Sequence, residues 1–109
     1  MKTRIKICGL TREDDVDAAV AAGADAIGLV FHPPSPRFVT PQRAAELARR
    51  IPPFVAVVGL FVNATRETVL AACDALPIGI LQFHGDEEAA WCRQFARPYL
   101  RAARVRPGL

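Results

Sequence analysis

The sequence predicts an α/β fold in which parallel strands alternate with helices within one domain. Five apolar runs rich in β-branched residues begin about every 24 residues, and helical patterns lie between them. Nearly uninterrupted apolar runs are typical of parallel strands that are buried on both faces. A length of 109 residues with 51% apolar and 23% charged residues suits one packed domain rather than a disordered chain.

The predicted strands are the five apolar runs, and the second and third are almost continuously apolar. They cover residues 4–8, 26–31, 55–62, 78–83 and 99–105. A parallel strand must be reached through a crossover, so each strand–helix–strand unit should be a right-handed crossover. The expected order of elements is therefore βαβαβαβαβ.

The four predicted helices each have a candidate N-cap residue, whose side-chain oxygen accepts a hydrogen bond from a free backbone N–H. These residues are Thr11, Thr40, Thr65 and Asp86. Pro41 suits the first position of the second helix, where its missing N–H costs nothing. Glu87 and Glu88 are expected in the first turn of the fourth helix, near the positive end of its dipole.

Two architectures fit this alternation, namely an open flavodoxin-like sheet of five strands and part of a (βα)₈ barrel. Eight units of about 24 residues need about 190 residues, close to the smallest such barrels at about 200. The 109 residues hold about four and a half units. As an isolated fold the chain would be an open sheet, and as a piece it would be the first half of a barrel.

Composition and charge argue against several classes of protein. Residues 1–88 carry a net charge of −2 and residues 89–109 a net charge of +5, so the basic excess lies wholly in the last segment. We therefore expect no nucleic-acid binding. No apolar run reaches about 18 residues, and no apolar segment typical of a signal peptide follows the first residues, so we expect a cytoplasmic protein without membrane spans. The three cysteines show no zinc-binding spacing, so no metal is expected.

The side chains capable of chemistry follow the strands, at the end of the sheet where α/β proteins bind ligands. Strand alternation places Lys6 and Cys8 on one face of the first strand. A nearby ammonium favours the reactive thiolate form of a cysteine, but Cys8 can equally be a small buried side chain. Cys73 and Cys92 lie mid-helix and are read as structural.

Arg37 and His84 follow the second and fourth strands. Arg37 comes after a stiff proline-rich stretch at residues 33–36, and a guanidinium held in this way suits a carboxylate or phosphate. A solvated surface arginine is the alternative. His84 can donate a hydrogen bond to a substrate or merely end its strand.

Four motifs occur in order along nearly the whole chain. They are KICGLT at 6–11, GLVF at 28–31 with SPRFV at 35–39, VGLFVN at 58–63, and LQFHGDE at 81–87. Together they resemble the phosphoribosylanthranilate isomerase family of tryptophan biosynthesis. RAARV at 101–105 is similar to the fifth strand of that family, which often begins with lysine where this chain has arginine.

The resemblance implies the fold and the reaction. The family fold is a small (βα)₈ barrel, so residues 1–109 are expected to be one incomplete barrel domain with strands one to five and helices one to four. The family converts N-(5-phosphoribosyl)anthranilate to 1-(2-carboxyphenylamino)-1-deoxyribulose 5-phosphate by an Amadori rearrangement, without cofactor or metal. By this resemblance Cys8 is the general base at C2′, Arg37 binds the anthranilate carboxylate, and His84 lies near the substrate. Lys6, on the same strand face as Cys8, joins the substrate-binding set.

The same resemblance implies what the 109 residues lack. The general acid of the family is an aspartate after the sixth strand, and its phosphate-binding loops follow strands seven and eight. We therefore expect this chain to be close to inactive alone. The alternative is a non-catalytic α/β module that binds a small molecule or assembles with another half-barrel. Open sheet edges at strands one and five predict homo-oligomers or pairing with a C-terminal half.

Overall fold

The structure, a computed structural model, describes residues 3–102 as alternating strands and helices. The strands are β1 (Lys6–Cys8), β2 (Ala26–Val30), β3 (Ala56–Phe61), β4 (Ile80–Phe83) and β5 (Tyr99–Arg101). The helices are α1 (Glu13–Ala21), α2 (Pro41–Ala48), α3 (Arg66–Ala75) and α4 (Ala89–Arg93). The predicted order of elements is confirmed. Residues 103–105 of the predicted fifth strand lie outside the described residues.

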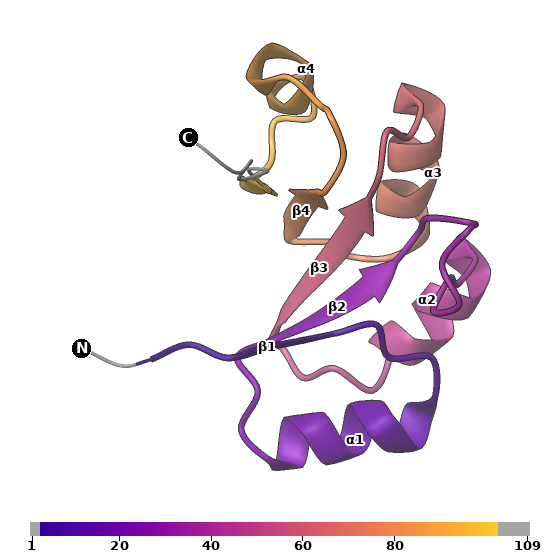
Figure 1. The fold of residues 1–109 in the computed structure, drawn as a ribbon. Helices are drawn as coiled ribbons and strands as arrows, with labels where there is room; N and C mark the ends of the chain where they lie inside the picture. The colour runs from indigo at the N-terminus through magenta and orange to yellow at the C-terminus, as the bar shows by residue number, and fades with distance from the viewer. Residues whose placement is uncertain (1–2, 103–109) are drawn as a thin grey trace, which may run out of the picture.

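The sheet topology decides between the two architectures. All neighbouring strands pair in parallel, and their spatial order is β1-β2-β3-β4-β5. The four helices form an arc along one side of this sheet (Figure 1). A flavodoxin-like sheet has the order 2-1-3-4-5 and helices on both faces. The open doubly wound sheet is therefore wrong, and the chain folds as half of a (βα)₈ barrel.

The face of the sheet without helices, called the inner face below, is concave. The ammonium of Lys6 on β1 donates a hydrogen bond to the side-chain oxygen of Gln82 on β4. Neighbouring strands lie about 4.8 Å apart, so β1 and β4 would be about 14 Å apart in a flat sheet. Side chains stand roughly perpendicular to a sheet. The two side chains meet because the sheet curves toward this face, as it does inside a barrel.

The core lies on the opposite face, between the sheet and the helices. Phe83 of β4 is fully buried, and its ring centroid lies between 5.4 and 6.2 Å from those of four other aromatic residues. These are Phe61, Trp91, Phe95 and Tyr99. Burial of this face leaves the alternate positions of each strand, including Lys6, Cys8 and Gln82, on the inner face.

Two of the four predicted N-caps are confirmed. The hydroxyl of Thr40 accepts a hydrogen bond from the backbone N–H of Arg43 at 3.1 Å, and Pro41 follows as the first helical residue. The hydroxyl of Thr65 accepts one from the backbone N–H of Thr68 at 3.2 Å. These caps fix the starts of α2 and α3, and therefore the lengths of the loops that follow β2 and β3.

The other two predicted N-caps, Thr11 and Asp86, are wrong. Helix α1 begins later, at Glu13, and the carbonyl of Thr11 instead accepts a hydrogen bond from the Arg43 guanidinium at 3.2 Å. Helix α4 begins only at Ala89. The backbone N–H of Asp86 donates to the side chain of Asn63 at 2.8 Å, so this segment is held as a loop instead of opening the helix. Within residues 3–102, no helix is long and apolar enough to cross a membrane.

Candidate active site

The sequence-predicted site residues lie at or after the carboxyl ends of the parallel strands. Cys8 is the last residue of β1, Arg37 lies in the loop between β2 and α2, and His84 directly follows β4. Lys6 lies on β1, two residues before Cys8. The carboxyl ends of parallel strands meet at one edge of a sheet, which is where barrels and open α/β sheets carry their ligand sites.

Cys8 is half-buried and lies over Gly28 of the neighbouring strand. A Cβ atom built on Gly28 would be 2.7 Å from the Cys8 Sγ. The missing side chain at Gly28 therefore makes the room that the thiol occupies. By contrast, burial raises the pKa of the Cys73 and Cys92 thiols, both on helices, which keeps them in the unreactive protonated form. Of the described cysteines, Cys8 alone lies on the inner face.

Lys6 has a partner that sequence reasoning did not assign to the site. Its ammonium is held by the side-chain oxygen of Gln82, which faces the interior from β4. The sequence feature that could have assigned Gln82 to the site is its position two residues before His84, because strand alternation places both residues on one face. The bond holds a positive charge over the inner face, on the strand that carries Cys8.

Arg37 lies against the backbone beside Cys8. A Cβ atom on Gly9 would be 2.6 Å from the Arg37 Cδ and 3.1 Å from its Nη1. Gly9 has a φ of +84°, which suits glycine, and its bare backbone leaves space for the arginine side chain. The Arg37 backbone N–H donates to the Ser35 hydroxyl at 3.1 Å within the proline-rich loop. No carboxylate within residues 3–102 pairs with this exposed guanidinium.

His84 is exposed just beyond the end of β4. Its backbone N–H donates to the carbonyl of Phe61 at 2.9 Å, which extends the pairing with β3 by one residue. No hydrogen bond links its side chain to the other three predicted site residues within the described part of the chain. The structure thus places Arg37 against Gly9, the residue that follows Cys8, and joins Lys6 to Gln82. It leaves His84 at the same end of the sheet without a hydrogen bond to these residues.

A hydrogen-bonded cluster next to His84 was missed by sequence reasoning. The Glu87 carboxylate accepts hydrogen bonds from the backbone N–H groups of Asn63 at 2.7 Å and Gly85 at 2.8 Å. The sequence pattern placed Glu87 in the first turn of a helix, whereas it precedes α4 and turns back to the loops. The bond from Asn63 joins the loop after β3 to the loop after β4, and the bond from Gly85 braces the loop after β4 itself.

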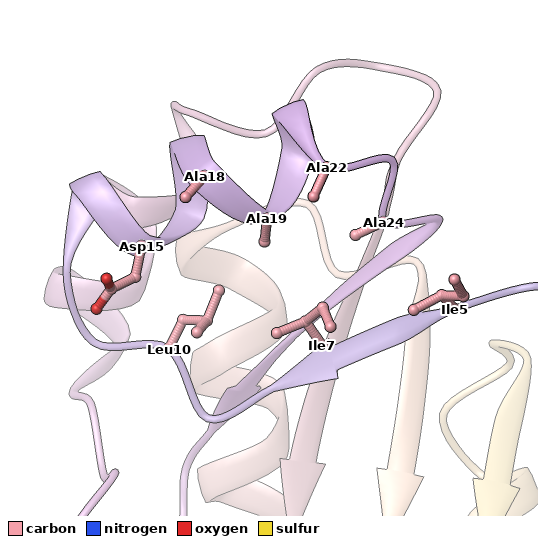
Figure 2. A pocket seen from close by; sticks show the side chains of 8 residues that line it. All are labelled: Ile5, Ile7, Leu10, Asp15, Ala18, Ala19, Ala22 and Ala24. Atoms are coloured by element: carbon pink, nitrogen blue, oxygen red, sulfur yellow. The ribbon is translucent and has the colours of Figure 1, made fainter.

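A second concave surface, called the outer groove below, lies between β1 and α1 (Figure 2). Its volume is about 480 Å³, and its lining is aliphatic except for one carboxylate. The lining residues are Ile5, Ile7, Leu10, Asp15, Ala18, Ala19, Ala22 and Ala24. It opens on the helix side of β1, opposite the inner face, and offers no nucleophile. Within residues 3–102, no three His, Cys, Asp or Glu side chains gather so as to hold a metal ion.

Known proteins of one enzyme family are similar to this chain over its whole length. The family model described as N-(5'phosphoribosyl)anthranilate (PRA) isomerase matches residues 5–105. The N-(5'-phosphoribosyl)anthranilate isomerase of Dechloromonas aromatica is 82% identical over the whole chain, which covers 52% of that protein. The corresponding protein of Leptothrix cholodnii is 66% identical over 98% of the chain, which covers 49% of it. The chain thus spans about half the length of these curated relatives.

Solved structures of phosphoribosyl anthranilate isomerases are similar to this chain in fold. The phosphoribosyl anthranilate isomerase of Thermotoga maritima superposes with a TM-score of 0.87 at 37% identity, over 92% of this chain and 50% of that one. A phosphoribosyl anthranilate isomerase in complex with reduced 1-(o-carboxyphenylamino)-1-deoxyribulose 5-phosphate gives the same TM-score and identity, over 92% of this chain and 53% of that one. The enzyme of Thermus thermophilus gives 0.88 at 34% identity, over 94% and 52%.

Proposed function

Because the chain belongs to the N-(5'-phosphoribosyl)anthranilate isomerase family, we propose that it supplies the base and the carboxylate-binding half of that enzyme's active site. The reaction is the Amadori rearrangement of N-(5-phosphoribosyl)anthranilate to 1-(2-carboxyphenylamino)-1-deoxyribulose 5-phosphate. The observation that carries this proposal is the position of Arg37, whose side chain lies across Gly9, the residue that follows Cys8. In this proposal an anion bound by Arg37 lies at the end of β1 that carries the Cys8 thiol.

In this proposal Cys8 acts as the general base. An acid first protonates the ring oxygen, and the C1′–O bond breaks as the nitrogen donates its electron pair, which gives an open-chain iminium ion at C1′. The Cys8 thiolate then removes the proton from C2′, and the electron pair of that C–H bond neutralises the iminium ion to give an enolamine. The enolamine takes up a proton at C1′ and loses the proton of its 2′-hydroxyl to become the ketone. A general base must be deprotonated near the working pH, and a nearby ammonium favours a thiolate. Lys6, held over the same face by Gln82, is the candidate for that ammonium.

Arg37 and His84 bind the substrate in this proposal. A guanidinium presents paired N–H donors that match a carboxylate, so Arg37 is assigned to the anthranilate carboxylate. His84, exposed at the same end of the sheet, is assigned a hydrogen bond to the substrate. All the steps of this reaction are acid–base steps, so the proposal includes no cofactor. For a biosynthetic reaction of this kind, the proposed location of the protein is the cytoplasm.

The general acid and the phosphate site are proposed to come from the elements that follow the fifth strand in the relatives. Loss of a positioned general acid typically costs about 10²–10⁴-fold in rate. Loss of the phosphate site removes remote binding energy that stabilises the transition state. Residues 1–109 alone should therefore be nearly inactive.

Protection of Cys8 from alkylation tests the substrate-binding half of the proposal. The reduced product analogue, 1-(o-carboxyphenylamino)-1-deoxyribulose 5-phosphate in reduced form, should slow iodoacetamide modification of Cys8 but not of Cys73, as measured by peptide mass spectrometry. Arg37→Met should abolish protection. Arg66→Met, which removes an exposed arginine from α3, is the matched control and should retain it. Absence of protection in the unaltered chain would contradict the proposal.

The second candidate function is a half-barrel assembly module, and the outer groove favours it. Among the described residues, β1 and β5 end the sheet, and edge strands template association. Ile5, which directly precedes β1, and Ile7 on β1 are 51% and 37% exposed in the groove (Figure 2). A strand added beside β1 would bring its helix over these side chains. We expect homo-oligomers or pairing with a C-terminal half, and a monodisperse monomer in light scattering would contradict this.

A further inference from the structure

We propose that Asn63 and Glu87 form a latch that positions His84 toward the substrate, which makes them positioning residues of the site. The inference rests on the proposed function in one respect, namely that His84 contacts the substrate. The latch itself consists of three hydrogen bonds: two run between the loop after β3 and the loop after β4, and one lies within the loop after β4.

Glu87 provides two of the three bonds through one carboxylate. Its Oε2 accepts from the backbone N–H of Asn63 at 2.7 Å, and its Oε1 accepts from the backbone N–H of Gly85 at 2.8 Å. Hydrogen bonds to an ionised acceptor are roughly twice as strong as those between neutral groups. A single side chain thereby ties both loops, and its loss would release both N–H groups together.

Asn63 provides the third bond in the opposite direction. Its Oδ1 accepts from the backbone N–H of Asp86 at 2.8 Å. Asn63 has a φ of +48°, in the left-handed region that asparagine tolerates better than most residues. This backbone conformation lies two residues after the end of β3, and Asn63 directs its N–H to Glu87 and its side chain to Asp86.

The latch closes directly over Gly85, the neighbour of His84. A Cβ atom on Gly85 would be 2.5 Å from the Asn63 Oδ1 and 2.7 Å from its Cγ. On the other side, the His84 N–H is bound to the carbonyl of Phe61 in β3 at 2.9 Å. The backbone of His84 is therefore fixed by the sheet before it and by the latch after it, while its side chain stays exposed.

Glu88 provides a matched control one residue away. It is exposed, and it occupies the N-cap position of α4 without a side-chain hydrogen bond to the helix. Glu88→Ala removes the same charge and the same number of atoms as Glu87→Ala. Any difference between the two variants therefore reports the latch, and a general effect of negative charge near α4 would appear in both.

The first measurement follows the latch without a ligand. In the isotope-labelled full chain, Glu87→Ala should speed hydrogen exchange of the Asn63 and Gly85 amides about tenfold or more, and Glu88→Ala should not. The imidazole resonance of His84 should shift only in the Glu87 variant, with His32 as internal reference. Glu87→Gln keeps one acceptor oxygen and should fall between the unaltered chain and Glu87→Ala. Equal behaviour of the Glu87 and Glu88 variants would overturn the latch.

The second measurement asks whether the latch acts through His84. The probe is the reduced product analogue, followed by chemical-shift titration. Glu87→Ala should weaken binding of the analogue about tenfold, which is within the coupling range for residues of one hydrogen-bonded network. In a chain that already carries His84→Ala, adding Glu87→Ala should change the affinity little. If the two changes weakened binding independently, so that their fold-changes multiplied in the double variant, the positioning role would be refuted. If the unaltered chain does not bind the probe, the proposed function fails, and the exchange rates alone decide the latch.

Discussion

Replacement of Gly28 by alanine tests how tightly β1 and β2 pack at the proposed base. The new Cβ would lie 2.7 Å from the Cys8 Sγ, 3.1 Å from its Cβ and 3.3 Å from its Cα. Such atoms normally approach to about 3.5–4.0 Å. The sulfur can rotate away, but the Cα belongs to the backbone of β1. Relief therefore requires the two strands to move apart, at the edge of the sheet where β1 has only one described neighbour.

The expected cost follows from the size of this overlap. Overpacking of a well-packed site costs about 1–3 kcal/mol, and 1 kcal/mol shifts the Tm of a domain of this size by about 4–8 °C. Gly79→Ala is the matched control because the nearest atom to its Cβ would be the Val57 carbonyl oxygen at 4.0 Å. Its φ is not in the left-handed region, so alanine there should stabilise by about 0.4–1 kcal/mol. The two variants should differ by about 1.5–4 kcal/mol.

Urea unfolding followed by circular dichroism measures this difference directly. Iodoacetamide labelling provides a second readout, since the thiol pushed away from Gly28 toward the open inner face should react faster, while Cys73 should react as before. If Gly28→Ala were as stable as Gly79→Ala and Cys8 reacted at its original rate, Cys8 would not lie against β2.

Two further predictions concern the rest of the fold. The hydrogen bond from Arg43 lowers the pKa of Glu13 from 4.5 to about 2, so the pair contributes stability above pH 4.5 that is lost as the pH falls to about 2. Glu13→Gln should thus lower the urea midpoint at pH 6 but not at pH 2. Asp14→Asn, at an exposed position, should change the urea midpoint equally at the two pH values. An effect of Glu13→Gln that is the same at both pH values would contradict this prediction. Phe83→Ala should cost about 3–5 kcal/mol in urea unfolding because Phe83 is fully buried, whereas Phe54→Ala, at a fully exposed ring, should stay within about 0.5 kcal/mol. Equal costs would show that the aromatic cluster around Phe83 is not part of the core.

Local patterns were sufficient to predict the elements but not their arrangement. Alternating apolar runs and the threonine caps of α2 and α3 depend on near neighbours in the chain, so the sequence reveals them. The strand order does not depend on near neighbours, because open sheets and barrels use the same strand–helix–strand units. The contact from Lys6 to Gln82, 76 residues apart, reflects the curvature that separates the two folds. Among the sequence features, only the family resemblance favoured the barrel.

In the candidate site, the positions of residues on one strand were predictable from the sequence, but contacts between different loops were not. The two-residue alternation of a strand is sufficient to place Lys6 and Cys8 on one face. The approach of Arg37 to Gly9 depends on the path of a proline-rich loop, which spacing alone does not give. Glu87 was misassigned to the first turn of α4 because acidic residues are typical there, whereas its partners lie in two loops that come together only in the folded sheet.

Turnover of N-(5-phosphoribosyl)anthranilate tests the central claim most directly. The chain is assayed alone and after mixing with the second half of the Dechloromonas aromatica relative, with Cys8→Ala and Cys73→Ala variants of the chain. The proposal predicts near-background turnover by the chain alone, and turnover by the mixture that Cys8→Ala abolishes and Cys73→Ala preserves. Substantial turnover by the chain alone, or a mixture that stays active with Cys8→Ala, would contradict the account.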